Sequence, residues 1–264
     1  MDPSQRATIV KWCLYVTDTP SNLSGKGSTY IVMAGHVSLH RQVFVIHLGR
    51  IAYQDAWNTQ QILARRYLDH LKVPVLGPSK PRDSILICEH EPVYTIGVRS
   101  RDFLVSEEQK LKNLGAHFHR TNRGGLITFH GPGQLVAYPI LNLHHFKKSV
   151  RWYISQLERT VIHTCQELGV KAGTSCDTGV WVKDNKLAAI GIQCSRYITT
   201  HGLGINCNTD LSWFDNIVPC GLKDKGITSL ARELQRDVPV HEVLPVFLKA
   251  FAKEFNCSIV EADA

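Results

Sequence analysis

Apolar residues recur at two periods along the chain, and these periods predict helices and strands. The apolar positions of residues 53–71 and 151–168 approximate helical spacing, and residues 240–255 predict a last helix. Residues 106–114 predict a short helix, with the serine at 106 as its N-cap and Gly115 as its end. Short apolar runs predict strands at 43–48, 84–89, 93–98, 116–120, 126–129, 134–140, 179–182, 187–193 and 257–260.

These strands and helices alternate, which is typical of an α/β domain. The length of 264 residues suits one large domain or two small ones. No linker composition interrupts residues 43–264, so we expect them to form a single domain. Residues 1–42 predict an N-terminal extension that serves targeting or lacks order. The acidic residues Asp2 and Asp18 make it a weak match to a mitochondrial transit peptide.

Composition and charge exclude several classes of protein. The net charge of +7 favours acidic partners, but Lys and Arg are spread along the chain without the block typical of nucleic-acid binding. No apolar run approaches the ~18 residues that a membrane span needs. The eight cysteines include no C-x-x-C pair, which argues against a zinc ribbon or a thioredoxin motif. We expect a reducing compartment, with most cysteines as small buried apolar residues.

The stretch from Arg123 to Gln134 carries the strongest local signal, because four of its twelve residues are glycines. Each glycine raises the entropy cost of ordering the backbone by about 0.5–1 kcal/mol relative to alanine within a regular element. We therefore expect this backbone to approach a ligand closely, with its donors facing that ligand. A tight hairpin with a solvent-exposed His130 is the alternative interpretation.

Three further positions carry candidate chemistry. Cys220 lies between a proline and a glycine, which suggests a fixed corner rather than a packed helix face. Lys186 follows the turn of a predicted hairpin and precedes small residues at 188–191, which leave room for a chain segment or a ligand. A solvated turn lysine is the simpler interpretation. His201 stands in a second His-Gly segment, for which a strand with a glycine bulge and a surface histidine is an equally good interpretation. His90 lies between two glutamates, and we interpret it as part of a charged strand end rather than as a metal ligand.

A cysteine nucleophile needs its thiolate, and an adjacent cation such as a lysine ammonium favours the thiolate by lowering the pKa of the thiol. Spacing alone does not show that Cys220 and Lys186 meet.

Six segments of the chain together resemble the lipoyl(octanoyl) transferase family, the octanoyl-[acyl carrier protein]:protein N-octanoyltransferases, in their animal mitochondrial branch. The resemblance extends over residues 47–260. It rests on LGRIAYQDAW at 48–57, EHEPVYTIG at 89–97, RGGLITFHGPGQLVAYP at 123–139, GVWV at 179–182, KLAAIGIQCSRYITTHGLGINCNTDLSWF at 186–214 and IVPCGLKDKGITSL at 217–230.

This resemblance implies an α+β fold similar to the biotin and lipoate protein ligases, with a mixed β-sheet and packed helices. It implies that Cys220 takes the octanoyl group from octanoyl-acyl carrier protein as a thioester, assisted by Lys186. A lysine of a lipoyl domain or of the glycine cleavage H protein then receives that group. The resemblance also implies a mitochondrial location. A thioester-to-amide transfer is downhill, so we expect no ATP, cofactor or metal, and an acidic carrier protein suits the positive net charge.

The resemblance also implies which residues bind the substrate, although His130 and His201 could either contact it or hold loops. Gly204 stands where many family members have alanine. Three other functions remain open: an ATP-dependent lipoate–protein ligase, a non-catalytic lipoyl-domain binder, and a cysteine hydrolase. The implied substrate-binding residues are Arg123, Gly124, Gly125, Leu126, Ile127, Thr128, Phe129, His130, Ala189, Ile190, Gly191, Gly202, Leu203 and Gly204.

Overall fold

The structure is a computed structural model that describes residues 41–74, 77, 80–100, 103–217 and 225–261. Within these residues, eight strands form one sheet in the order β10–β8–β9–β6–β2–β1–β11, and β7 pairs with β8. Neighbouring strands from β2 to β8 are antiparallel, whereas β1 is parallel to both β2 and β11, so the sheet is mixed as predicted. The strands are β1 (Arg41–Ile51), β2 (Ser84–His90), β6 (Gln134–Ile140), β7 (Val180–Val182), β8 (Asn185–Ser195), β9 (Ile198–Asn206), β10 (Gly226–Ile227) and β11 (Cys257–Glu261).

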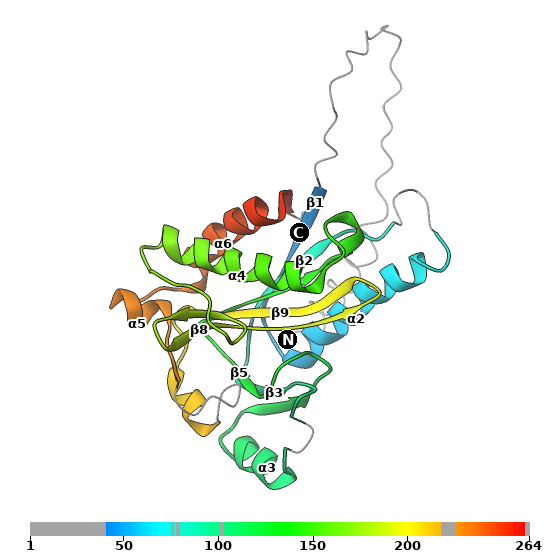
Figure 1. Cartoon of the computed structure of the whole chain (residues 1–264). Coiled ribbons are helices and arrows are strands. Elements are labelled where there is room, and N and C mark those ends of the chain that lie inside the picture. The colour runs from blue at the N-terminus through cyan, green and yellow to red at the C-terminus, as the bar shows by residue number, and fades with distance from the viewer. Residues whose placement is uncertain (1–40, 75–76, 78–79, 101–102, 218–224, 262–264) are drawn as a thin grey trace, which may run out of the picture.

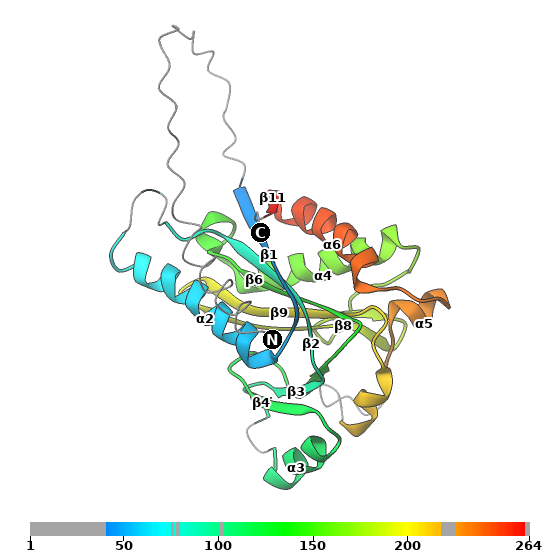
Figure 2. The same cartoon turned by 180° about the vertical axis from the view of Figure 1, so that it is seen from behind.

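Helices cover both faces of this sheet (Figures 1 and 2). The helices α4 (Val150–Glu167) and α6 (Val240–Phe255) pack side by side over one face. The helix α2 (Tyr53–His70) lies against β9 and β6 on the other face. The short helix α5 (Leu230–Leu234) lies between β10 and α6 along the chain. No helix among the described residues is long and apolar enough to cross a membrane.

A second, three-stranded sheet lies below the main sheet in Figure 1, in the order β4–β3–β5. The helix α3 (Val105–Asn113) and the 3-10 helix η3 (Leu211–Asn216) pack against it around a separate cluster of buried apolar side chains. The strands of this sheet are β3 (Val93–Ile96), β4 (His117–Arg120) and β5 (Thr128–His130).

The sequence of α4 explains its boundaries and its buried face. Ser149 Oγ accepts a 3.2 Å hydrogen bond from Trp152 N, which satisfies one of the free donors at the start of the helix. Tyr153, Leu157 and Val161 recur every four residues, and all three are fully buried in the main core against α6 and the sheet. The same spacing predicted this helix from the sequence, and the structure confirms it.

One local prediction and one alternative interpretation are wrong. The helix α3 begins at Val105 with Leu104 as its N-cap, rather than at Ser106, and the carboxylate of Glu107 accepts a 3.1 Å hydrogen bond from Leu104 N. The glycine-rich stretch is not a hairpin, because β5 pairs with β3 in the small sheet whereas β6 pairs with β2 and β9 in the main sheet. The stretch therefore crosses from one sheet to the other, and His130 is buried.

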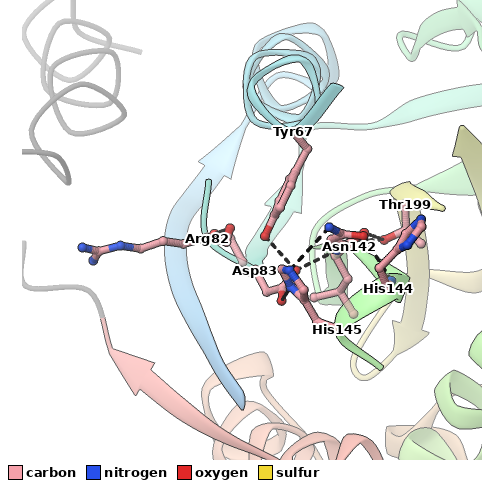
Figure 3. A network of polar contacts seen from close by, with 9 residues as sticks. Tyr67, Arg82, Asp83, Asn142, His144, His145 and Thr199 are labelled. Carbon is pink, nitrogen blue, oxygen red and sulfur yellow. Dashed lines mark hydrogen bonds and ion pairs between the residues drawn. The ribbon is translucent and has the colours of Figure 1, made fainter. Parts of the chain in front are cut away.

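A buried carboxylate, that of Asp83, connects α2 to the main sheet at the start of β2 (Figure 3). Asp83 Oδ1 accepts hydrogen bonds from Tyr67 Oη at 2.8 Å and from Asn142 N at 2.7 Å. Asp83 Oδ2 lies 2.6 Å from His145 Nδ1. Asp83 thus joins α2, the start of β2 and the 3-10 helix η2 (Leu143–His145).

Most of the described cysteines are buried, as the sequence predicts. Two of the eight, Cys13 and Cys220, lie outside the described residues. Of the others, Cys194 is half-buried and Cys176 is exposed, while those in the core are Cys88, Cys165, Cys207 and Cys257.

Candidate active site

A pocket lies between the glycine-rich segment and the middle of the strands β8 and β9. The residues that line it come from three of the predicted segments and from α2 and β6. They are Tyr53, Arg123, Gly125, Leu126, Thr128, His130, Tyr138, Ala189, Ile190, Gly191, His201, Gly202, Leu203 and Gly204. The antiparallel register of β8 and β9, in which Gly191 is opposite Gly202, brings segments ten or more residues apart in the chain to one wall.

Three residues of the predicted binding segment do not line this pocket. Gly124 N donates a 2.8 Å hydrogen bond to the backbone oxygen of Ile192, which fastens the segment to β8. Ile127 is buried in the core of the small sheet. Phe129 is in the same core and stacks on Trp213, with ring centroids 5.1 Å apart. The Gly124 backbone and the side chains of Ile127 and Phe129 position the segment.

Glycine at 191 permits the close approach of the binding segment to β8. A Cβ atom at this position would lie 3.0 Å from Gly124 O and 3.2 Å from the Cδ of Arg123. The small residues predicted at 188–191 therefore do make room for another chain segment. Ala188 differs from this expectation, because it is buried in the main core and does not line the pocket.

Arg123 brings a buried positive charge to the pocket wall, where its side chain is 7 % exposed. Its Nη2 donates to the backbone oxygen of Thr95 at 2.7 Å and to the Oγ1 of Thr95 at 2.9 Å. Its Nη1 donates to Gly124 O at 2.9 Å. Buried charges need such acceptors, and these hydrogen bonds fix the guanidinium beside the pocket.

Two histidines in the pocket are held neutral. His130 Nδ1–H donates to Gln134 Oε1 at 2.7 Å, and His201 Nε2–H donates to Asn122 Oδ1 at 2.8 Å. Burial lowers the pKa of each histidine to about 3, and the charge of Arg123 adds to this lowering in both. Neutral imidazoles carry one donor and one acceptor, so these bonds fix the tautomers.

An aromatic cluster closes the pocket on the side of α2. The Tyr53 ring stacks parallel to His130 at 6.3 Å, and its Oη lies 3.5 Å from His201 Nδ1. His90 Nδ1–H donates to the last backbone oxygen of β1 at 2.9 Å, and His90 Nε2 accepts from Tyr138 Oη at 2.8 Å. Burial lowers the pKa of His90 to about 4. The strand β2 ends at His90 as predicted, but the imidazole is buried and neutral rather than part of a charged end.

The structure describes one member of the predicted catalytic pair. Cys220 lies outside the described residues. Lys186 is the second residue of β8 and is buried, so the interpretation as a solvated turn lysine is wrong. It precedes Ala189 by three residues, about 10 Å along the strand. The Nζ of Lys186 lies 4.7 Å from the centroid of the Trp181 ring. Lys225 Nζ approaches the same ring at 4.6 Å.

Tyr53, Tyr138 and Trp181 received no site role from the sequence. All three occupy apolar positions of a predicted helix or strand, and an aromatic residue fits the core equally well. The signal that could have found them is their placement within the strings that carry the resemblance.

The fold first defines a structural class, that of the lipoate–protein ligases. A solved lipoate–protein ligase A bound with ATP matches with a TM-score of 0.62 at 15% identity, over 85% of this chain and 89% of that chain. A putative lipoate protein ligase from Thermoplasma acidophilum with bound lipoic acid matches with a TM-score of 0.60 at 15% identity, over 85% and 89% of the two chains. The predicted fold is thereby confirmed. The chain belongs to the lipoyl protein ligase A/B catalytic domain family, which matches residues 52–252.

Curated relatives narrow the resemblance within this family. The Danio rerio protein named octanoyl-[acyl-carrier-protein]:protein N-octanoyltransferase LIPT2, mitochondrial, is 61% identical over 217 residues, 82% of this chain and 94% of that protein. The Homo sapiens protein of the same name is 41% identical over 227 residues, 84% of this chain and 97% of that protein. A putative mitochondrial lipoyltransferase 2 of Drosophila melanogaster is 51% identical over 220 residues, 83% of this chain and 92% of that protein. The resemblance to the octanoyltransferases is confirmed.

Proposed function

We propose that this chain is a mitochondrial octanoyltransferase that moves an octanoyl group from octanoyl-acyl carrier protein to a lysine of lipoyl-domain proteins. The observation that carries this proposal is the 41–61% identity to the LIPT2 octanoyltransferases over nearly their whole length. On the basis of the resemblance alone, we also propose the glycine cleavage H protein as an acceptor.

The first step loads the enzyme. The thiolate of Cys220 attacks the carbonyl carbon of the octanoyl thioester, and a new C–S bond forms while the bond to the carrier thiol breaks. The released carrier thiolate takes the proton that Cys220 lost, with the Lys186 ammonium as the group that carries it. An ammonium beside the cysteine also stabilises its thiolate.

The second step delivers the acyl group. The neutral ε-amine of the acceptor lysine attacks the thioester on Cys220, and an amide bond forms as the C–S bond breaks. The proton of the attacking amine passes to the departing thiolate, which returns the enzyme to its starting state. An amide is more stable than a thioester, so neither step needs ATP.

The lining of the pocket supports this proposal because much of it is apolar. Ala189, Ile190 and Leu203 contribute apolar surface, and the glycines of the lining carry no side chain that would fill the pocket. The histidines beside it are neutral at physiological pH because burial lowers their pKa values to about 3. An octanoyl chain lying there from the Lys186 side would meet His201 and Tyr53 at the far end.

The test is the intact mass of the protein after mixing with octanoyl-acyl carrier protein. We expect a gain of one octanoyl group on the wild type, no gain on Cys220→Ser, and slower loading on Lys186→Ala. Addition of a lipoyl domain should then discharge the adduct and raise the mass of the acceptor by the same amount.

A lipoate–protein ligase would give a different pattern. It would modify the acceptor from free octanoate and ATP, form no adduct from the carrier, and tolerate Cys220→Ser. A hydrolase would release octanoate without an acceptor. Any of these outcomes would replace the transferase proposal, and an unmodified acceptor under both conditions would leave only a binding role.

A further inference from the structure

The indole ring of Trp181 is buried and rigidly held in the short strand β7, where it is 3 % exposed. The backbone N and O of Trp181 each form a 2.8 Å hydrogen bond with Gly173. The indole Nε1 donates a 3.0 Å hydrogen bond to the backbone oxygen of Asp177. Because both the backbone and the ring edge are fixed, the ring presents a face of defined position.

That face lies against Lys186, the cross-strand partner of Trp181 in the antiparallel pair β7–β8. The 4.7 Å from Lys186 Nζ to the ring centroid is within the ~6 Å at which a cation is attracted to an aromatic face. Lys186 is only 5 % exposed, so its ammonium has lost most of its hydration and needs electrostatic compensation from the protein. The indole face is a source of that compensation.

Gly179 lies between the β8 backbone at Ala188 and the Lys186 stem. Its φ of +129° is a conformation that side chains disfavour. A Cβ at this position would lie 2.6 Å from Ala188 O and 3.4 Å from the Cε of Lys186. The glycine thus lets β8 approach closely at Ala188, and the Lys186 stem lies in van der Waals contact with the start of β7.

A second ammonium approaches the same ring from a more exposed position. Lys225 Nζ lies 4.6 Å from the Trp181 centroid, and it also lies 3.0 Å from the carboxylate of Asp177. Its side chain is one-quarter exposed, so water and a carboxylate both stabilise its charge. Lys225 is the more exposed of the two lysines, and it serves as a control for the effect of the ring on Lys186.

We propose that Trp181 is a positioning residue for Lys186. The indole face holds the Lys186 amine in one position, from which it takes the part in the transfer that the proposed function gives it. This inference rests on the proposed function, because it relies on the role that the proposed function assigns to Lys186. The contact between Lys186 and the Trp181 ring depends on the electron density of the ring as well as on its shape. A purely structural role would depend on the shape alone.

The test replaces Trp181 with tryptophans that carry one to four fluorine atoms, each installed at this position alone. Fluorine withdraws electron density from the ring face and changes its size very little. We expect the rate constant for loading by octanoyl-acyl carrier protein to fall stepwise, by about tenfold over the series, with KM unchanged. The same substitutions at Trp152, whose ring packs on Phe255 at 5.7 Å, should leave loading unchanged. Equal rates throughout the Trp181 series would overturn the proposal.

Two variants add independent outcomes. Trp181→Phe, which keeps an aromatic face, should load faster than Trp181→Leu. In Lys225→Gln the dependence on fluorine should persist, and its loss there would show that the ring acts on Lys225 instead, against the proposal.

The controls separate this inference from the function on which it rests. Absence of any octanoyl adduct on the wild type would reject the transferase and the inference together. Normal loading of Lys186→Ala would reject the role of Lys186 and therefore the inference. Slow loading of Lys186→Ala with a flat fluorine series would reject the positioning role of Trp181 alone.

Discussion

The buried histidines of the pocket make the stability of the protein depend on pH. In the unfolded chain a histidine has a pKa of about 6.5, whereas burial lowers the pKa of His201 to about 3 in the folded state. As pH falls from about 6.5 to 3, the unfolded state takes up a proton that the folded state does not. His201 therefore destabilises the fold progressively through this window, and adds no pH dependence above it.

We expect the free energy of unfolding to fall with decreasing pH by up to about 1.4 kcal/mol per pH unit for each such histidine. The residue His201 has a φ of 57°, which asparagine tolerates best among uncharged polar side chains. His201→Asn should therefore be less stable at pH 7 but show a smaller loss between pH 6 and pH 4. Urea titrations at each pH would measure both, and parallel curves for the two proteins would contradict the assignment.

A single methyl group should disturb the pocket wall at Gly191. In Gly191→Ala the new Cβ would press on Gly124 O and on the Arg123 side chain, each within 3.2 Å, and the binding segment would have to move away from β8. We expect loading by octanoyl-acyl carrier protein to slow by about tenfold or more, as small displacements of positioning residues do. A stopped-time mass assay of the adduct would measure it.

Gly173→Ala is the matched control, because a Cβ at Gly173 meets no atom within 4 Å. Its backbone bridge to Trp181 does not involve the side chain. Equal loading by both alanine variants would show that the packing at Gly191 does not matter to the reaction.

At the scale of elements, the buried carboxylate of Asp83 fastens α2 to the sheet at the end away from the pocket (Figure 3). It lies seven residues before His90, roughly 23 Å along β2. In Asp83→Leu the Tyr67 hydroxyl and the Asn142 backbone donor would lose their acceptor while buried. We expect a loss of about 3–5 kcal/mol in the free energy of unfolding, with turnover per folded molecule unchanged.

Tyr67→Phe tests the same network more gently, because it removes one donor and leaves the carboxylate two others. A loss of about 1–2 kcal/mol by urea denaturation is expected. Equal losses in Asp83→Leu and Tyr67→Phe would mean that the Asp83 carboxylate contributes no more to the stability of the fold than the Tyr67 hydroxyl does.

The elements themselves were largely predictable, for a local reason. Helical periodicity in α2, α4 and α6 arises from one buried face, and that face is visible in the sequence alone. The partition of β5 and β6 between two sheets was not predictable, because their partners β3 and β9 are distant in the chain. Turn-rich sequence between two apolar runs looks the same whether the strands pair with each other or separate.

At the scale of the whole molecule, the site is assembled from segments that no local pattern connects. Arg123 to His130, the middle of β8 and the middle of β9 meet only through the register of the sheet. The resemblance to the octanoyltransferases identified these segments together, whereas composition and spacing offered only separate candidates. Tyr53 and Trp181 were missed because apolar periodicity does not distinguish a pocket wall from a core.

The net charge of the chain leads to a prediction about the donor protein. The chain carries 30 Lys and Arg against 23 Asp and Glu, and the proposed donor is an acidic protein. Attraction between them should hasten their encounter at low ionic strength and weaken as salt screens it over about 10 Å or less above 0.1 M. We expect kcat/KM for octanoyl-acyl carrier protein to fall by about tenfold between 0.05 and 0.5 M NaCl.

A small uncharged octanoyl thioester provides the control for this salt effect. It enters the same pocket without the carrier protein, and the histidines there are neutral, so salt should change its kcat/KM by less than about twofold. If both donors slowed equally, salt would act on the enzyme's chemistry or fold rather than on docking. If neither slowed, charge would have no part in the recognition of the donor, and the pocket would have to supply the preference through the acyl chain.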